Sequence, residues 1–275
     1  MTRVCIKGME SGELDEVLGW AETEGWNPGL DDAAAFHSAD PAGFLLALCD
    51  GEPVGAISVV NHSDRYAFLG LYICRPDWRG QGIGSMLWKR GLAHGGARTI
   101  GLDGVAAQEA NYARSGFVRN GATLRFEGRQ NGSRRPGVRP ALPQDLERIE
   151  HLDRAATGVE RPRFLSAWVK PSLHRRTLVF EDNQGVQAFA TVRACRTGCK
   201  IGPIVAPDAA HAMALVASAD GPEPWIIDVP EANDAFIRDL RALGYHETFR
   251  TARMYRGSHA PGNGWEQAIA TMELG

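Results

Sequence analysis

Apolar residues in the first half of the chain follow two periodicities. At Leu14, Val17, Leu18 and Ala21 they recur every three or four positions, which predicts one buried face of a helix that starts at Ser11. Short apolar runs bounded by glycine, asparagine or aspartate predict strands instead. We predict strands at residues 4–6, 44–48, 53–60, 66–74, 99–105 and 118–127, and further helices at 85–94 and 108–115. Strands followed by alternating helices and strands favour a mixed α/β sheet.

The second half of the chain has a similar order of elements. A helix marked by Leu146, Ile149 and Leu152 comes first. Strands are predicted at 177–180, 186–192, 200–205, 225–229 and 248–255, helices at 209–218 and 232–243, and a weakly alternating last strand at 268–274. Pro-Asp follows the third strand at 76–77 and again at 207–208. These features indicate a diverged internal repeat.

The boundary between the repeats is predicted from composition. Residues 128–136 contain no apolar side chain and combine glycine, proline and like charges, so they are unsuited to a core. A chain of 275 residues is long enough for two domains. We therefore divide it into a first domain at 1–130, a linker at 131–138 and a second domain at 139–275.

Charge and cysteine content narrow the function classes. The net charge is −3 and neither half has a basic excess, so we expect no nucleic-acid partner. No run approaches the roughly 18 apolar residues of a membrane helix, and the first residues lack the pattern of a secretory signal. The 5 cysteines are scattered, which favours a reducing cytoplasm. Cys195 and Cys199 have no second ligand pair nearby, so we expect thiols and no metal site.

The most informative segment is 71–84, in which a strand leads through a glycine-rich turn into a helix. The first N–H groups of a helix have no partner within it. Gly80, Gly82 and Gly84 have no side chains to keep a ligand away from those amides, and Arg79 adds positive charge at the rim. This arrangement suits phosphate oxygens, although a glycine-rich helix start without a ligand is the alternative. Neither a P-loop nor a dinucleotide fingerprint fits the segment.

At these residues the sequence resembles the GNAT superfamily of acetyl-CoA-dependent N-acyltransferases. Arg79-x-x-Gly82-x-Gly84 matches the family's (Gln/Arg)-x-x-Gly-x-(Gly/Ala), and Tyr112-x-Arg114-x-Gly116-Phe117 resembles its Tyr-x-Lys-x-Gly-Phe. The resemblance covers about residues 3–128. It implies a mostly antiparallel central sheet, flanked by helices, with a cleft where one strand splays from its neighbour. With the internal repeat, we predict two such domains in tandem.

The resemblance also implies roles for residues and a cosubstrate, acetyl-CoA. The amides of the turn would hold its pyrophosphate, with contributions from Arg79, Gly80, Gln81, Gly82, Ile83, Gly84 and Ser85. The strand end at Ile73 and Cys74 would pair with the pantetheine arm. Tyr112 would act as general acid for the departing thiolate, and the alternative for Tyr112 is a packing role. The family often has an asparagine where this chain has Val105, so that contact is either missing or supplied by Gln108 or Asn111.

A primary amine of a small molecule or peptide would attack the thioester directly. It must first lose a proton, and relatives often carry a glutamate on the fourth strand, but residues 66–74 contain no acid. His62 and Asp64 in the preceding turn are candidates near the acceptor, as are Asp31, Asp32 and His37 in a loop over the entrance. The alternative for each of these residues is a solvated position in a loop. Trp26 and Asn27 would line the acceptor pocket or cap the core.

The second half lacks the residues that this chemistry needs. Alignment of the repeats places Ala210, Met213 and Leu215 at the positions of Arg79, Gly82 and Gly84, and Leu240 at that of Tyr112. This half resembles a GNAT-like module that follows the catalytic domain in two-domain acetyltransferases, in segments 201–206, 227–230 and 253–257. Such a degenerate copy would wall the acceptor pocket, form a homodimer or bind an effector.

Three functions remain open from the sequence. We predict an N-acetyltransferase whose active site lies in the first half. The alternative is a non-catalytic acyl-CoA sensor or interaction protein. A third reading places the centre in the second half, at Asp228, His246 and Glu247.

Overall fold

The computed structural model describes residues 4–130 and 132–275. In the first half, the strands at Tyr66–Cys74 and Thr99–Val105 have the predicted bounds, and the first helix buries Leu14, Val17, Leu18 and Ala21 as its periodicity predicts. The elements of this half are β1 (Val4–Gly8), α1 (Ser11–Thr23), α2 (Asp32–Ala39), β2 (Phe44–Cys49), β3 (Glu52–Asn61), β4 (Tyr66–Cys74), α3 (Ile83–Gly95), β5 (Thr99–Val105), α4 (Glu109–Arg114) and β6 (Val118–Gly128).

The second half contains β7 (Val138–Pro140), α5 (Leu146–Thr157), α6 (Pro162–Trp168), β8 (Arg175–Asp182), β9 (Gly185–Ala194), β10 (Cys199–Val205), α7 (Ala209–Ser218), β11 (Trp225–Pro230), α8 (Asp234–Ala242), β12 (His246–Arg256) and β13 (Glu266–Ala268). Three short elements, α2, α6 and β7, were not predicted from the sequence. The strand predicted at 268–274 is wrong, because β13 ends at Ala268. The residues after it form an irregular segment that is almost entirely buried.

All the described strands join one mixed sheet, which confirms the predicted fold class. Its order is β1-β2-β3-β4-β5-β12-β6-β11-β10-β9-β8-β7, with β13 paired to β10. The two halves have exchanged their last long strands. β12 lies between β5 and β6, with Thr251 opposite Val105, and β6 lies against β11, with Phe126 opposite Ile227. The hydrogen bonds of the sheet therefore run continuously from one half to the other. The division into two domains at 131–138 stays a prediction.

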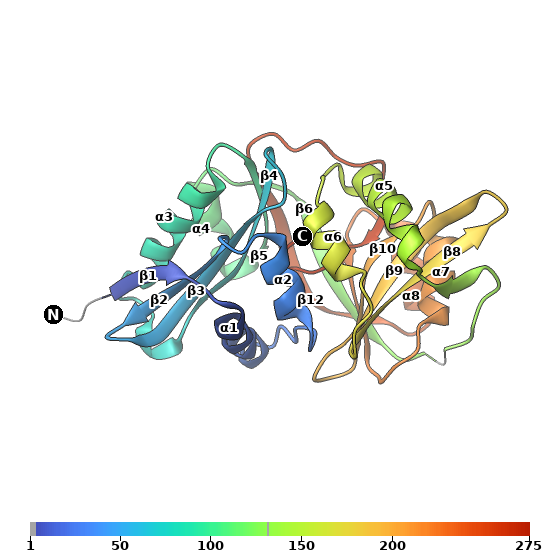
Figure 1. The fold of residues 1–275 in the computed structure, drawn as a ribbon, viewed down its shortest axis with the longest axis horizontal. Helices are drawn as coiled ribbons and strands as arrows, with labels where there is room; N and C mark the ends of the chain where they lie inside the picture. Colours follow the sequence, from blue (N-terminus) through green and yellow to red (C-terminus); the bar gives the residue numbers. More distant parts are fainter. Residues whose placement is uncertain (1–3, 131) are drawn as a thin grey trace.

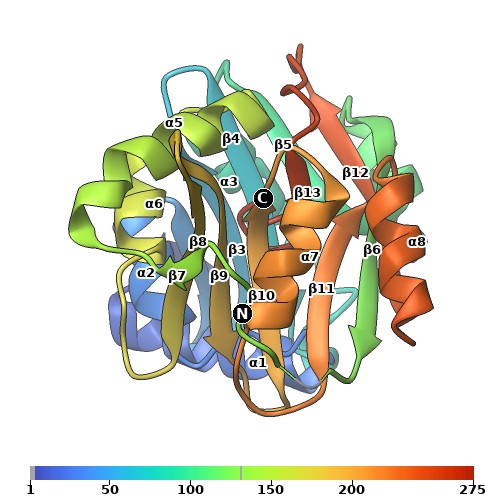
Figure 2. The same ribbon diagram turned by 90° about the vertical axis from the view of Figure 1, so that its right-hand side faces the viewer.

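Helices cover the sheet in separate groups. α3 and α4 pack on the outer face of the first half, and α7 and α8 cover the strands of the second half (Figures 1 and 2). α1, α2 and α6 form a core between the halves, in which Phe36 stacks on Trp168 with ring centroids 5.9 Å apart. The C-terminal end of the chain lies in this central region (Figure 1).

Asp32 is the polar centre of the contact between the halves. We predicted a loop residue there that was either solvated or a base, but Asp32 begins α2 and is 1% exposed. Its carboxylate forms ion pairs with the buried guanidinium groups of Arg175, at 2.8 Å, and Arg193. Both guanidinium groups also stack on the ring of Trp168. Asp32 therefore joins α2 to β8 and β9, and it is unavailable to a substrate.

Candidate active site

The candidate site begins where β4 separates from β5. The two strands pair in parallel only from Tyr66 opposite Thr99 to Leu69 opposite Leu102. Beyond that point β4 contains a bulge, in which Leu71 and Tyr72 face the single residue Ile57 of β3, and Leu71 has a φ of 44°. The extra residue reverses which side chains face which side of the sheet. Leu69 and Tyr72 pack toward α3 and α4, whereas Leu71 packs toward α1 and α2.

A cavity of about 550 Å³ passes through the sheet at this separation. Its walls include Tyr72, Leu102 and Tyr112 from the α3 and α4 face. They also include Trp26, Arg125, Phe249, Met272 and Glu273, which do not belong to that face. The cavity therefore has one mouth at the start of α3 and a second region between the two halves of the molecule.

The glycine-rich turn forms the first end of this cavity. Gly82 caps α3 with a φ of 84°, a conformation that glycine adopts without steric cost. The first backbone bond of the helix runs from the N–H of Met86 to the carbonyl of Gly82, at 3.2 Å, so the preceding amides have no partner within the helix. Gly80, Gly82, Gly84 and Ser85 line the cavity. The turn therefore presents free N–H groups at the positive end of the helix dipole.

Arg79 is held beside the turn rather than free. Its Nε donates to the carbonyl of Cys74 at 2.9 Å, and its NH2 pairs with Glu24. The guanidinium group lines the cavity but shares its charge with a carboxylate. Gln81 donates to the carbonyl of Asp77, and the side chain of Ile83 is buried in the core, so only their backbone amides face the turn.

Tyr112, in α4, is one of the residues that line the cavity. It is 8% exposed, and its ring stacks on Trp88 at 5.4 Å with an interplanar angle of 17°. Burial, together with the neighbouring Tyr72, raises the pKa of Tyr112 to about 12. The hydroxyl is therefore protonated near neutral pH, and no residue that the structure describes forms a hydrogen bond with it. A hydroxyl in this state can donate a proton to a group in the cavity.

Some of the other predicted site residues line the cavity, and some do not. Ile73, Cys74 and Trp26 line the cavity, as does Gln108. Asn111 does not, because it is exposed and bonds to Gln108 and Arg114.

Three further acceptor-side predictions, Asn27, His62 and Asp64, also lie outside the cavity lining. Asn27 donates to the carbonyl of Thr197 at 2.8 Å, in the turn between β9 and β10. His62 lies 2.9 Å from the carbonyl of Leu274 and packs edge-on against Phe164. Asp64 is exposed and approaches Arg98 no closer than 3.9 Å. These three residues are therefore positioned by contacts with the second half or with solvent, which a local sequence pattern does not reveal.

Several lining residues were not singled out from the sequence. Met272 and Glu273 belong to the segment after β13, Phe249 and Thr251 to β12, Arg125 to β6 and Asp103 to β5. Arg125 and Asp228 form a buried ion pair at 2.7 and 2.9 Å. Asp103 accepts from Thr123 and Thr251 and pairs with Arg253 at 2.6 Å. Glu273 could have been noticed in the sequence only as an acidic residue with no assigned role. No motif surrounds it.

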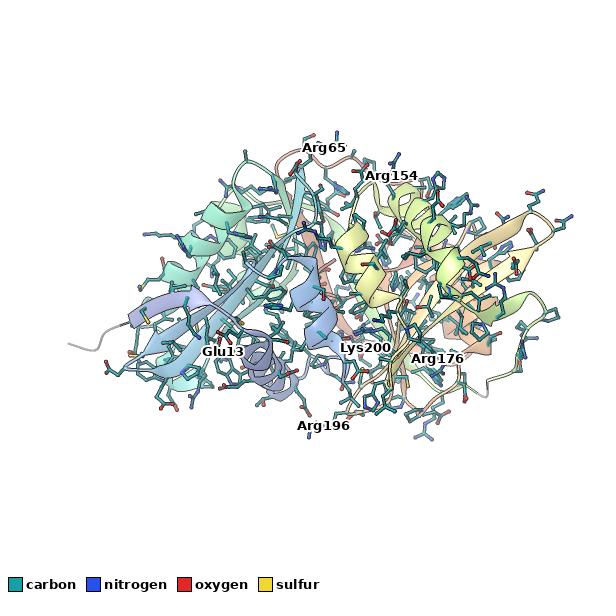
Figure 3. All side chains as sticks on the ribbon, viewed as in Figure 1. Glu13, Arg65, Arg154, Arg176, Arg196 and Lys200 are labelled. Carbon is teal, nitrogen blue, oxygen red and sulfur yellow. The ribbon has the colours of Figure 1, made fainter. Side chains whose placement is uncertain are left out.

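Glu273 is 3% exposed, and its backbone lies directly against β4. A Cβ on Gly70 would lie 2.0 Å from the carbonyl oxygen of Glu273, so only glycine permits this contact. Burial raises the pKa of the Glu273 carboxyl, against the opposing charges of Lys200 and Arg125. Lys200 is itself buried where the halves meet (Figure 3), with its pKa lowered by burial, and it donates to the carbonyl of Trp26 at 2.9 Å.

The equivalent separation in the second half is filled by the chain itself. β10 and β11 pair in parallel at residues 199–201, and β13 then pairs with β10 at Ile204 and Val205. Leu215, at the position of Gly84, is completely buried in the core. In the part of the chain that the structure describes, this half therefore has no free gap between its two parallel strands and no glycine-rich turn at the start of α7.

Within residues 4–130 and 132–275, no group of three or more histidine, cysteine or acidic side chains is arranged to hold a metal ion. No helix in these ranges is long and apolar enough to cross a membrane.

Comparison with known proteins identifies the family. One model of the GNAT acetyltransferase family matches residues 12–121, and a GNAT acetyltransferase domain model matches residues 149–270. A holothin acyltransferase from a Pseudoalteromonas species is 35% identical over 264 residues, which cover 93% of this chain and 89% of the relative. The chain belongs to the GNAT acyltransferase family.

Solved structures agree with this GNAT fold. A protein of Pyrococcus horikoshii, described as an acetyltransferase, superposes with a TM-score of 0.83 at 24% identity, over 99% of this chain and 96% of that chain. A tandem GNAT protein from the clavulanic acid biosynthesis pathway gives a TM-score of 0.62 at 16% identity, over 94% of this chain and 100% of that chain. Tandem GNAT architecture therefore occurs in another solved structure, and the predicted family and tandem arrangement are confirmed.

Proposed function

We propose that this GNAT protein is an N-acyltransferase that transfers the acetyl group of acetyl-CoA to a primary amine within a ternary complex. The observation that carries the proposal is the cavity through the sheet, which has free amides at one end and Tyr112 in its wall. The free amides suit the pyrophosphate of CoA, and the separated edges of β4 and β5 leave backbone groups for the pantetheine amides. The holothin acyltransferase relative supports acyl transfer and makes holothin one acceptor to test.

The chemistry follows from the positions of the protein groups. The thioester supplies an activated carbonyl with a thiolate leaving group. The neutral amine attacks the carbonyl carbon, a C–N bond forms and the C–S bond breaks. Tyr112 donates its proton to the sulfur, because its hydroxyl is protonated at neutral pH and the residue lines the same cavity.

The test of cosubstrate binding uses two glycines of similar backbone conformation. Gly82, with a φ of 84°, opens α3, and Gly244, with a φ of 87°, follows α8 in the second half. Acetyl-CoA and CoA are titrated calorimetrically into the wild type, Gly82→Trp and Gly244→Trp. We expect one site per chain in the wild type and in Gly244→Trp, and loss of binding in Gly82→Trp, because the indole would cover the free amides.

Three results would contradict the proposal. Absence of acetyl-CoA binding in the wild type would remove its basis. Retained binding in Gly82→Trp would place the cosubstrate elsewhere in the molecule. Binding without turnover of holothin or of any simple amine would favour the acyl-CoA sensor instead.

A further inference from the structure

Glu273 and Tyr112 line the same cavity from opposite faces of the sheet. Tyr112 packs with the core under α3 and α4. Glu273 lies between Ala270 and Leu274, the residues by which its segment packs into the core of α1, α2 and α6. An amine that reaches the cavity from between the halves would therefore meet Glu273 first, and the sulfur of the thioester would leave toward Tyr112.

Glu273 also differs from the other carboxylates of the cavity. Among the described residues, three acidic side chains line it, namely those of Glu24, Asp103 and Glu273. Glu24 pairs with Arg79, and Asp103 pairs with Arg253. Glu273 forms no ion pair with any residue that the structure describes. Its Oε2 accepts from the Thr271 hydroxyl, and its Oε1 has no hydrogen-bond partner in the same part of the chain.

The segment that carries Glu273 is fixed on both sides. Arg193 donates to the carbonyl of Ala270 at 3.0 Å, and Ile269 donates to the carbonyl of Asp228 at 3.0 Å. His62 bonds to the carbonyl of Leu274, and Gly70 allows the backbone of Glu273 to lie against β4. The carboxylate is therefore held at the bulge of β4 by residues of both halves.

The walls beside Glu273 indicate the kind of amine that fits. Trp26, Phe249 and Met272 are partly exposed, and all three line the cavity. The whole cavity of about 550 Å³ must also admit the acyl end of CoA. The remaining space suits a compact molecule with an apolar body better than a peptide.

We infer that Glu273, supplied by the second half, binds the acceptor ammonium group and removes its proton, and that the acceptor is a compact primary amine with an apolar or aromatic body. This inference rests on the proposed function. It assigns a catalytic role to the degenerate half, since that half provides the acid that β4 lacks. Trp26, Phe249 and Met272 would select the body of the substrate.

The protons balance through these two residues. The ammonium group gives one proton to the Glu273 carboxylate, which later releases it to solvent. The neutral amine then forms the C–N bond, and the C–S bond breaks. Tyr112 gives its proton to the thiolate, and the second proton lost by the nitrogen restores the Tyr112 hydroxyl.

The test compares Glu273→Gln with a matched control, Glu266→Gln. Glu266 is a second glutamate of the C-terminal region whose pKa is also raised by burial, but it lines a separate cavity of about 190 Å³. The assay follows thiol release from acetyl-CoA with phenethylamine between pH 6 and 10. We expect Glu273→Gln to lower kcat/KM at pH 7 by about 100-fold or more, as loss of a general base does, while the affinity for acetyl-CoA is unchanged.

The pH profile separates a chemical role from a structural one. In Glu273→Gln, kcat/KM should rise about tenfold per pH unit toward the amine pKa near 10, because solvent then has to supply the free amine. Glu266→Gln should follow the wild type. A loss that high pH does not restore, or a variant with the wild-type profile, would overturn the role of Glu273.

Two further outcomes distinguish failure of the proposed function from failure of the assigned substrate class. If the wild type neither binds acetyl-CoA nor releases thiol with any amine, the proposed function itself fails. If triglycine is acetylated with a higher kcat/KM than phenethylamine, the assigned substrate class is wrong while the role of Glu273 can still stand.

Discussion

His62 connects the first half to the C-terminal segment, and it does so as a neutral side chain. Its Nε2 lies 2.9 Å from the carbonyl of Leu274, and its ring contacts Phe164 and Tyr66 at centroid distances of 5.7 and 6.2 Å. Burial, and then the positive charge of Arg161, lowers the pKa of His62 to about 4. An unfolded histidine has a pKa of about 6.5.

The sign of the effect on stability follows from this difference. Between pH 6.5 and 4 the unfolded chain binds a proton at position 62 that the folded protein does not. The contribution of His62 to stability is therefore complete above about pH 6.5 and declines as the pH falls toward 4. The two pKa values give a loss of about 2 kcal/mol between pH 7.5 and pH 5, and about 3 kcal/mol when both states are protonated.

Urea unfolding of the wild type and His62→Gln at pH 7.5 and pH 5 measures the pH-dependent contribution of His62 to the free energy of unfolding. Every other titrating group, including His259, is common to the two proteins and cancels in the difference. We expect the wild type to lose about 2 kcal/mol more than His62→Gln between pH 7.5 and 5. His151→Gln, which removes an exposed histidine of α5, is the control. A difference between wild type and His62→Gln that is the same at both pH values would refute the reasoning.

Two further predictions concern the acid and the contact between the halves. Tyr112→Phe should reduce kcat by about 100-fold or more without changing acetyl-CoA affinity, because it removes only the hydroxyl to which we assign protonation of the thiolate. Steady-state kinetics and calorimetry check this, and an unchanged kcat would exclude the role. Asp32→Asn should lower the free energy of unfolding by about 3 to 5 kcal/mol, because it leaves Arg175 and Arg193 buried without a countercharge. Urea unfolding measures the loss, and Asp15→Asn on the exposed face of α1 is the control. A loss below about 1 kcal/mol would show that the two buried guanidinium groups do not need Asp32 as their countercharge.

The parts of the fold that could be predicted depend on local pattern. The run at 66–74 is apolar and bounded by polar turns, so both ends of β4 could be placed from the sequence. The turn at 79–84 could be proposed as a phosphate site because the chemistry expected there depends on backbone amides, which neighbouring glycines expose. Such features need no information about distant residues.

The parts that failed depend on partners far along the chain. The run at 248–255 predicts a strand, but it does not show that β12 would pair with β5 rather than with strands of its own half. Asp32 looks like a loop residue because its countercharges lie more than 140 positions away, on β8 and β9. Glu273 follows a weakly patterned segment, and its place in the first cavity is evident only in the folded chain, where its backbone lies against Gly70.

The C-terminal segment gives the two halves different roles. As β13 it pairs with β10 and fills the separation between β10 and β11, where a second cosubstrate would have to bind. It then continues past Gly202, whose Cβ would lie 2.3 Å from the carbonyl oxygen of Ile269, and reaches Gly70 with Glu273. A CoA molecule in the second cleft would displace β13 and, with it, the carboxylate of the first cavity. The chain must therefore occupy the cleft between β10 and β11 if the cavity between β4 and β5 is to be complete. For this reason, a half without a phosphate-binding turn remains part of the active site that we propose.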